Sequence, residues 1–208
     1  MILTTIHLNR SSAQVRADVA DLCRMHSRVI DATVGMPEGG PRVLWAQPRR
    51  ELLVVRAPEP VTAARLPRGY ATSIQHQPWR VPDCPGRWVM NAILNPARHN
   101  KTGGPTANNP DRPYRDGQPV LYKTAEDQAG WLARRIEGAD LRGYTVVLAQ
   151  VARGRHRTGR TVTVRRLSIR AEWQVTDPAA MADRLAAGVG MDKTWGCGLT
   201  LWAPAAGR

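Results

Sequence analysis

The sequence predicts an α+β protein of two tandem ferredoxin-like domains, residues 1–84 and 85–208, with a glycine-rich loop near the C-terminus. The first observation behind this prediction is the order strand, helix, strand, strand, short helix, strand in the first half, which is a split βαβ arrangement. The second is the loose return of that order in the second half, without a close sequence repeat.

The elements of the first half follow from apolar spacing and from residues that start or stop helices. Ile2, Thr4, Ile6 and Leu8 alternate and predict a strand over 2–8. A helix over about 12–34 ends at Gly35. Strands at 42–47 and 51–56, a short helix at 60–66 and a strand at 71–75 complete the unit.

The second half begins with a strong strand over 87–94. The segment 96–119 is rich in proline and glycine, so we expect it to be mobile or ordered only on binding. A helix runs from the N-cap Thr124 to about Ile136, with Ala125, Ala129 and Leu132 on its buried face. Strands at 144–152 and 160–175, a helix at 178–187 and a strand at 198–203 follow.

The charge of the chain indicates a polyanionic partner. Lysine and arginine number 30 against 17 acidic residues, a net charge of +13. An anionic membrane surface and charge for solubility alone are the alternatives to nucleic acid. No apolar run approaches the ~18 residues of a spanning helix, and the first residues do not resemble a signal peptide.

The cysteines point to a reducing compartment. Cys23, Cys84 and Cys197 are odd in number and far apart, which fits neither a disulfide framework nor a zinc site. We therefore expect the protein to lie in the cytoplasm.

An arginine-rich hairpin is the strongest binding signal. Seven arginines and no acid lie between Val151 and Ala171: Arg153, Arg155, Arg157, Arg160, Arg165, Arg166 and Arg170. The glycines of the segment 153–160 predict a hairpin loop, with His156 at its tip. Such a ribbon can contact phosphates across a groove, so we predict RNA binding by His156 and by all of these arginines except Arg170. The alternative is a solvated loop whose charge prevents edge aggregation.

The strand after the tip changes its apolar phase. Val162 and Val164 share one parity, whereas Leu167, Ile169 and Trp173 share the other. Because one face of a strand holds only one parity, we predict a bulge or kink near Arg165 and Arg166.

The glycine-rich segment 188–199 follows a helix and precedes a strand. Mononucleotide loops have the opposite order, which disfavours ATP or NAD. The glycines would let the backbone approach another chain closely, and Lys193 adds a positive charge. A tight connection without a ligand is the alternative.

This segment, followed by Leu201-Trp202-Ala203-Pro204, resembles the C-terminal signature of the CasE family, the repeat-processing endoribonucleases of type I-E CRISPR systems. Three further motifs share the resemblance: Met25-His26 on the first helix, Trp88 to Pro96 in mid-chain, and Lys123-Thr124 with Gly130-Trp131-Leu132 on the second helix. It spans the whole chain in the same order and spacing.

The resemblance implies two ferredoxin-like domains of the RRM-like, RAMP type. It implies cleavage of the precursor RNA at the base of the repeat hairpin, a 2′,3′-cyclic phosphate product and continued grip on the guide RNA. The implied partners are the repeat stem-loop and the other Cascade subunits, with the protein otherwise monomeric. His26 matches the family's catalytic histidine, whereas Cys23 stands where relatives often carry a tyrosine.

The chemistry needs a group that removes the proton of the 2′-hydroxyl, and histidine suits this because its pKa is ordinarily about 6.5. Arg24, Arg28 and Lys193 are candidate cations near the phosphate, and we expect Cys23 and Arg28 to act with His26. Periodicity alone instead makes His26 a core residue, unless the helix is interrupted between about Ala20 and Met25 or His26 lies at the rim of the apolar stripe.

No paired carboxylates and no histidines at metal-ligand spacing occur, which favours metal-independent chemistry without a cofactor. Because Cys23 replaces the tyrosine, a structured-RNA-binding subunit that cleaves weakly or not at all is the alternative function. A general ferredoxin-like RNA binder is a third, disfavoured because the chain has no Phe and only 4 Tyr to stack on bases.

Overall fold

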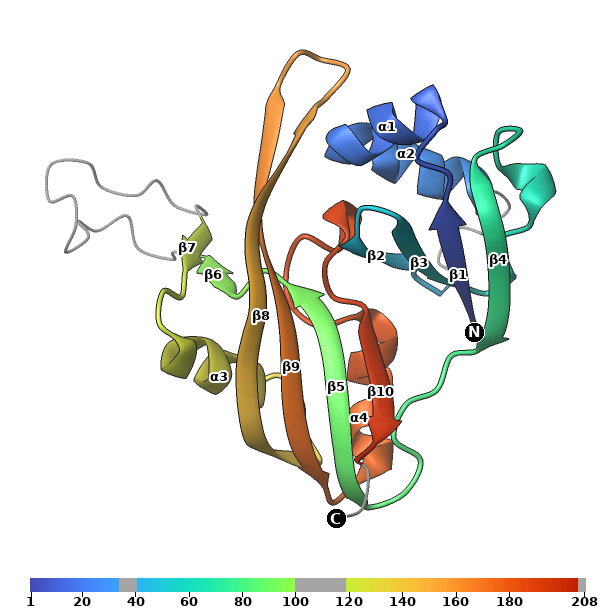
Figure 1. Cartoon of the computed structure of the whole chain (residues 1–208). Coiled ribbons are helices and arrows are strands. Elements are labelled where there is room, and N and C mark those ends of the chain that lie inside the picture. Colours follow the sequence, from blue (N-terminus) through green and yellow to red (C-terminus); the bar gives the residue numbers. More distant parts are fainter. Residues whose placement is uncertain (34–40, 100–118, 206–208) are drawn as a thin grey trace, which may run out of the picture.

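The computed structural model describes residues 1–33, 41–99 and 119–205, which form two four-stranded antiparallel sheets side by side (Figure 1). The first sheet has the order β2-β3-β1-β4 and the second the order β10-β5-β9-β8. The predicted α+β class with two ferredoxin-like units is confirmed. The first sheet lies within residues 2–78 and the second within 86–204, and the domain boundary after residue 84 stays a prediction.

The first half contains strands β1 (Ile2–Leu8), β2 (Leu44–Arg49), β3 (Leu52–Ala57) and β4 (Ala71–Pro78), helices α1 (Ala13–Ala20) and α2 (Leu22–Ala32), and the 3-10 turn η1 (Ala63–Arg65). Val15, Leu22, Met25 and Val29 of the two helices bury their side chains in the same core as Ile6 of β1. The helix predicted at 60–66 is therefore only a short turn. The predicted helix end at Gly35 lies outside the described residues.

The second half contains β5 (Gly86–Leu94), β8 (Ala139–Arg155), β9 (Thr161–Val175), β10 (Thr200–Pro204), α3 (Ala125–Ala133), α4 (Pro178–Ala187) and the 3-10 turn η2 (Lys193–Trp195). Two short strands, β6 (Ala97–His99) and β7 (Pro119–Leu121), pair at the ends of the proline-rich segment, and the expected mobility of 100–118 lies outside the described residues. Thr124 caps α3 as predicted, because its hydroxyl oxygen accepts a hydrogen bond of 3.1 Å from the backbone amide of Asp127.

The predicted buried face of α3 is partly wrong. Leu132 and Ile136 are buried, but Ala125 is exposed and Trp131 takes a central place in the core. None of the described helices has the length and apolar character that crossing a membrane requires.

Strand β9 belongs to two cores at once. Val162 and Val164 pack with the core of the first half, whereas Leu167, Ile169 and Trp173 pack in the core of the second half. The bulge predicted near Arg165 and Arg166 is wrong, because the register of β9 runs unbroken there, whereas the kink that was the alternative stays a prediction. The apolar parity changes because β9 packs with one face in the first core near its tip and with the other face in the second core beyond Arg166. The register shifts lie on β8 instead, at Leu141/Gly143 and Val146/Leu148.

Polar bonds join the two halves. The buried Arg56 of β3 donates to the carbonyl oxygens of Leu185 and Ala186 at the C-terminal end of α4, at 3.2 and 2.6 Å. Trp79 donates to the Thr200 carbonyl at 3.2 Å. A cation at the C-terminus of a helix satisfies carbonyl groups that lack partners within the helix. These bonds tie β3 and Trp79 of the first half to the end of α4 and to β10 of the second half.

Candidate active site

The helix predicted over 12–34 is interrupted at Asp21, within the interval where the catalytic interpretation of His26 required a break. The backbone of Asp21 is extended (φ −136°, ψ 115°), and its carboxylate accepts from the amides of Cys23 and Arg24 at 2.8 and 3.2 Å. An aspartate in this position satisfies free amides of the first helical turn and so begins a new helix. The break ends α1 at Ala20 and begins α2 at Leu22, and His26 lies on this second helix.

Asp21 also holds the arginine hairpin. Its second carboxylate oxygen accepts from the Arg155 amide of β8 at 3.1 Å, so one side chain joins the start of α2 to the ribbon. Gly154 makes this approach possible, because a Cβ there would lie 2.6 Å from the Cys23 amide nitrogen.

The prediction that Gly154 forms the hairpin turn is wrong. The turn spans 156–160, with Gly159 in the left-handed region (φ 83°).

A pocket of about 710 Å³, here called the histidine pocket, opens between α2, the hairpin tip and the glycine-rich loop. Three predicted groups meet in it, although they are far apart in the sequence. Its lining residues include Cys23, Arg24, His26, Ser27, Arg28, Asp31, Arg155, His156, Arg157, Thr194 and Trp195. The predicted catalytic residues and three of the seven predicted hairpin residues therefore share one cavity.

His26 is half-buried at the rim of the apolar stripe of α2. Its ring stands edge-on to Trp195, with 5.4 Å between the centroids, and its Nδ1 has no hydrogen-bond partner among the described residues. Burial lowers the pKa of His26 below its usual 6.5. The imidazole is therefore mostly neutral at pH 7, the form that can accept a proton.

Cys23 lies beside the histidine but is only 9% exposed. Burial, and then the negative charge of Asp21, raise the pKa of the thiol. The sulfur therefore stays protonated, and a thiol is a weak hydrogen-bond donor. This environment does not favour Cys23 as a nucleophile.

The arginines of α2 are held by a buried carboxylate. Arg28 Nε lies 3.0 Å from Asp18 Oδ2, and Arg24 Nε lies 3.4 Å from Asp18 Oδ1. The Tyr70 hydroxyl donates to the same carboxylate at 2.9 Å. Arg28 is 23% exposed and Arg24 57%, so Arg24 is freer to reach a ligand. Tyr70 is buried and does not line the histidine pocket, so it does not substitute for a tyrosine at position 23.

Other predicted binding residues lie outside the histidine pocket. Arg160 is exposed at the far side of the tip, and Arg153 lines a different pocket. Arg165 is half-buried. The prediction that Arg166 binds RNA together with the exposed hairpin arginines needs correction, because its side chain is only 3% exposed and points inward.

Lys193 does not join His26 either. Burial lowers the pKa of its amine, followed by the positive charges of Arg42, Arg184 and Arg135, which are its electrostatic neighbours. The glycine-rich loop instead presents Thr194 and Trp195 to the histidine. Gly196 (φ 77°) lets the loop pass over Trp45, where a Cβ would lie 2.7 Å from the ring. This glycine serves contact within the chain.

Several residues of the site were not singled out from the sequence. Asp21 had a detectable signal, since an aspartate before a helical segment is a common N-cap. Trp195 lies inside the glycine-rich segment, but nothing in its spacing points to His26. Asp18 and Tyr70 are joined only by the fold. No three of the described His, Cys, Asp and Glu residues are grouped so that they could hold a metal ion.

The arrangement places a neutral imidazole among several cations in a cavity open to solvent. Guanidinium groups bind phosphate and stabilise the charge that develops on it, and an imidazole can accept a proton from a sugar hydroxyl. The fold and the site thus define a class: a double ferredoxin-like protein with a histidine in a basic pocket that is open to solvent.

The sequence profile of a family described as CRISPR associated protein matches residues 1–204, so the chain belongs to that family. The resemblance to the CasE family carried by the sequence motifs is confirmed.

Named relatives cover nearly the whole chain. The CRISPR-associated endoribonuclease Cse3 of Thermus thermophilus is 29% identical over 225 residues, which cover 98% of this chain and 100% of the relative. The structure of Thermus thermophilus Cse3 bound to an RNA representing a pre-cleavage complex matches with a TM-score of 0.77 at 26% identity, covering 98% of each chain. The crystal structure of Cas6e from Escherichia coli shares the fold, with a TM-score of 0.69 at 15% identity and coverage of 98% of this chain and 100% of that one.

Proposed function

We propose that the protein is a metal-independent endoribonuclease that cleaves CRISPR precursor RNA at the base of the repeat hairpin. It then stays bound to the mature guide RNA as a subunit of a cytoplasmic Cascade complex. The single observation that carries this proposal is the meeting of His26 with Arg155, His156 and Arg157 in one pocket. Similarity to an endoribonuclease over the whole chain supports the reaction class.

In the proposed reaction the 2′-hydroxyl of the substrate attacks the adjacent phosphorus. His26 accepts the proton of that hydroxyl, the bond to the 5′-oxygen breaks, and that oxygen leaves with a proton from the medium. The products are a 2′,3′-cyclic phosphate and a 5′-hydroxyl end. Arg24, Arg28, Arg155 and Arg157 surround the space where the phosphate would lie, and no cofactor is required. Arg153, His156 and Arg160 hold the stem.

The test is single-turnover cleavage of a repeat stem-loop in EDTA by the wild type, by His26→Ala and by His7→Ala. His7 is exposed on β1 and lines neither the histidine pocket nor the pocket lined by Arg153. It therefore controls for the loss of a histidine elsewhere in the protein. We expect His26→Ala to cleave at least about 10²-fold more slowly while it binds the stem as before. Undiminished cleavage by His26→Ala would remove the imidazole from the mechanism.

The pH dependence of the same reaction gives a second readout. A base acts only when unprotonated, so the rate rises with pH and levels off above the pKa of the base. Since burial lowers the pKa of His26, we expect the plateau to begin below the usual pH of 6.5. A rate that keeps rising through pH 8 would indicate another base.

The alternative is an RNA-holding subunit that cleaves weakly or not at all. The buried, protonated thiol of Cys23 is the observation that favours it, because it supplies little hydrogen bonding to a phosphate. Wild-type protein that binds the stem-loop without releasing a cyclic phosphate end in a single turnover would support this alternative.

A further inference from the structure

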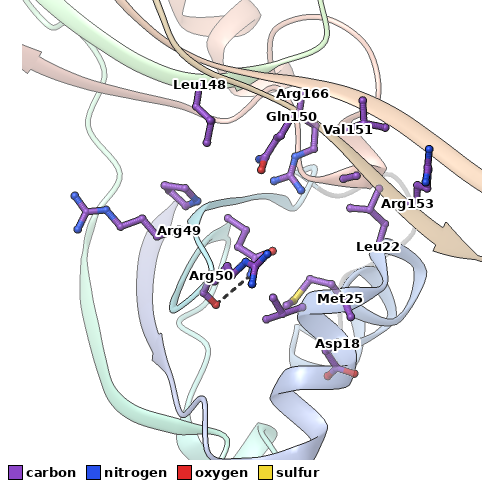
Figure 2. A pocket seen from close by; sticks show the side chains of 15 residues that line it. Asp18, Leu22, Met25, Arg49, Arg50, Leu148, Gln150, Val151, Arg153 and Arg166 are labelled. Carbon is purple, nitrogen blue, oxygen red and sulfur yellow. Dashed lines mark hydrogen bonds between the residues drawn. The ribbon is translucent and has the colours of Figure 1, made fainter.

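A second basic pocket lies beside the ribbon formed by β8 and β9. It has a volume of about 490 Å³ and is enclosed by the junction of α1 and α2, the β2–β3 hairpin and the ribbon (Figure 2). Its guanidinium and amide side chains are Arg49, Arg50, Arg153, Arg166, Gln47 and Gln150. We call it the Arg166 pocket. A cavity of this size falls within the range of ~300–1,000 Å³ that holds small organic ligands.

Arg166 is buried in the wall of this pocket. It is 3% exposed, and its Nε and Nη2 have no hydrogen-bond partner among the described residues. Its guanidinium lies 5.9 Å from the ring centroid of Trp45, and none of the described ion pairs includes it. Gln150 is its cross-strand partner, and Figure 2 shows the two side chains at the same wall. A buried cation without an acid partner is costly unless a ligand supplies the negative charge.

Acidic residues in the described parts of the chain do not neutralise the charge inside the pocket. Among the described residues Asp18 is the only acid that lines it, and its carboxylate is already bonded by Arg24, Arg28 and Tyr70. The lining arginines therefore leave a net positive potential toward the opening. An anionic ligand fits this potential.

Apolar side chains lie on both sides of the pocket. Leu148 and Val151 of β8 lie on the ribbon near Gln150 and are 48% and 59% exposed, whereas Leu22 and Met25 of α2 line the other side and are almost fully buried. Exposed apolar side chains beside free guanidinium groups match a ligand with an anionic part and a flat apolar part. An unpaired nucleotide has both, whereas in a duplex the base is stacked inside and unavailable to the wall.

The position of the pocket connects it to the histidine pocket. Arg153 lines the Arg166 pocket and Arg155 lines the histidine pocket, two residues further along the same strand and hence about 6.6 Å away. Asp18 borders both cavities. An RNA strand that leaves the histidine pocket along β8 therefore meets the Arg166 pocket next.

We propose that the Arg166 pocket binds one unpaired nucleotide of the RNA that flanks the stem. Arg166 receives its phosphate, Gln150 contacts the edge of its base, and Leu148 covers the face of the base. This inference rests on the proposed function for the identity of the polymer, but it concerns a subsite separate from His26.

The test measures binding of two RNAs by the full-length protein. One is a minimal repeat stem-loop, and the other carries unpaired nucleotides on either side of the stem. We expect the wild type to bind the extended RNA more tightly. Arg166→Met should lose about tenfold of that affinity, as expected for one charge-assisted contact, and keep the affinity for the minimal stem. Arg142→Met, an exposed arginine of β8 outside both pockets, should bind both RNAs like the wild type.

Two further measurements keep the outcome decisive. Gln150→Leu changes the same wall without removing the buried charge, so it replaces Arg166→Met if thermal melting shows that the latter is unfolded. A photoreactive uridine in the flank of the extended RNA, mixed with His26→Ala, should crosslink to β8 near Leu148 and Val151.

Equal weakening of both RNAs by Arg166→Met would mean that Arg166 only supports the fold, and the inference would fall. Unchanged binding of both RNAs, or crosslinks elsewhere, would overturn it as well. Failure of the wild type to cleave the stem-loop contradicts the proposed function instead, because the flank crosslink is measured with His26→Ala and does not depend on cleavage.

Discussion

The two ends of the β8–β9 ribbon are built on opposite principles. At its base, β9 is covered on both faces, with Val164 in one core and Leu167 in the other. At its tip, Arg155, Arg157 and Arg160 are exposed, and the contact with α2 consists of Asp21 and the glycine surface of Gly154. Burial of apolar side chains at the base fixes the direction of the whole ribbon. The tip buries little apolar surface, so its arginines stay accessible to a ligand.

We expect the largest effect from a substitution at the buried base of the ribbon, measured as a loss of stability. Leu167→Ala removes a side chain that is 1% exposed, and we expect it to lower the free energy of unfolding by about 2–5 kcal/mol. Urea denaturation measures this. The control is Val147→Ala on β8, whose side chain is 67% exposed and whose loss should change stability by less than about 0.5 kcal/mol. Equal losses for the two variants would mean that the base is not anchored by its cores.

A smaller effect is expected where the tip meets α2. Gly154→Ala forces a Cβ to within 2.6 Å of a backbone nitrogen, so the hairpin must move away from Cys23. We expect the single-turnover cleavage rate to fall by about 10²-fold, since small displacements of positioning groups cost that much. Gly143→Ala, on the same strand with its nearest contact at 3.5 Å, should cleave normally. Normal cleavage by Gly154→Ala would show that the tip need not touch α2.

The smallest effect concerns the outer end of the tip. Arg160→Gln should leave stability within about 0.5 kcal/mol, because Arg160 is exposed. If Arg160 contacts one phosphate, the slope of log binding constant against log salt should decrease in magnitude by about 0.7–0.9. Titrations of the stem-loop at several salt concentrations give this slope. An unchanged slope would confine phosphate contact to the arginines of the histidine pocket.

The sequence patterns predicted most of the framework, because each strand and helix has local periodicity. They failed at β9, since alternation reports that both faces are apolar but not that two separate cores cover them. They also misassigned Gly154, because a glycine that permits close approach to a distant helix looks the same as a glycine in a turn. In each case the missing information lies in a contact between residues far apart along the chain.

The same distinction holds for the candidate site. His26 and the arginines were chosen from a family resemblance and from charge, and the fold brings His26, Arg155 and Arg157 together. Lys193 and Arg166 were chosen on the same grounds, yet one faces other cations and the other is buried. Charge along a sequence indicates which ligand is expected, but only the tertiary packing determines which cation can reach it.

The double-sided burial of β9 limits how this region can be altered. Inserting one residue between Val164 and Leu167 would exchange the two faces of the strand beyond it and turn Leu167, Ile169 and Trp173 out of the second core, while Val162 and Val164 stay in the first. Strand β8 already absorbs irregularities at Leu141/Gly143 and Val146/Leu148 and has a free edge. Length changes are therefore expected to be tolerated better in β8 near these irregularities than in β9.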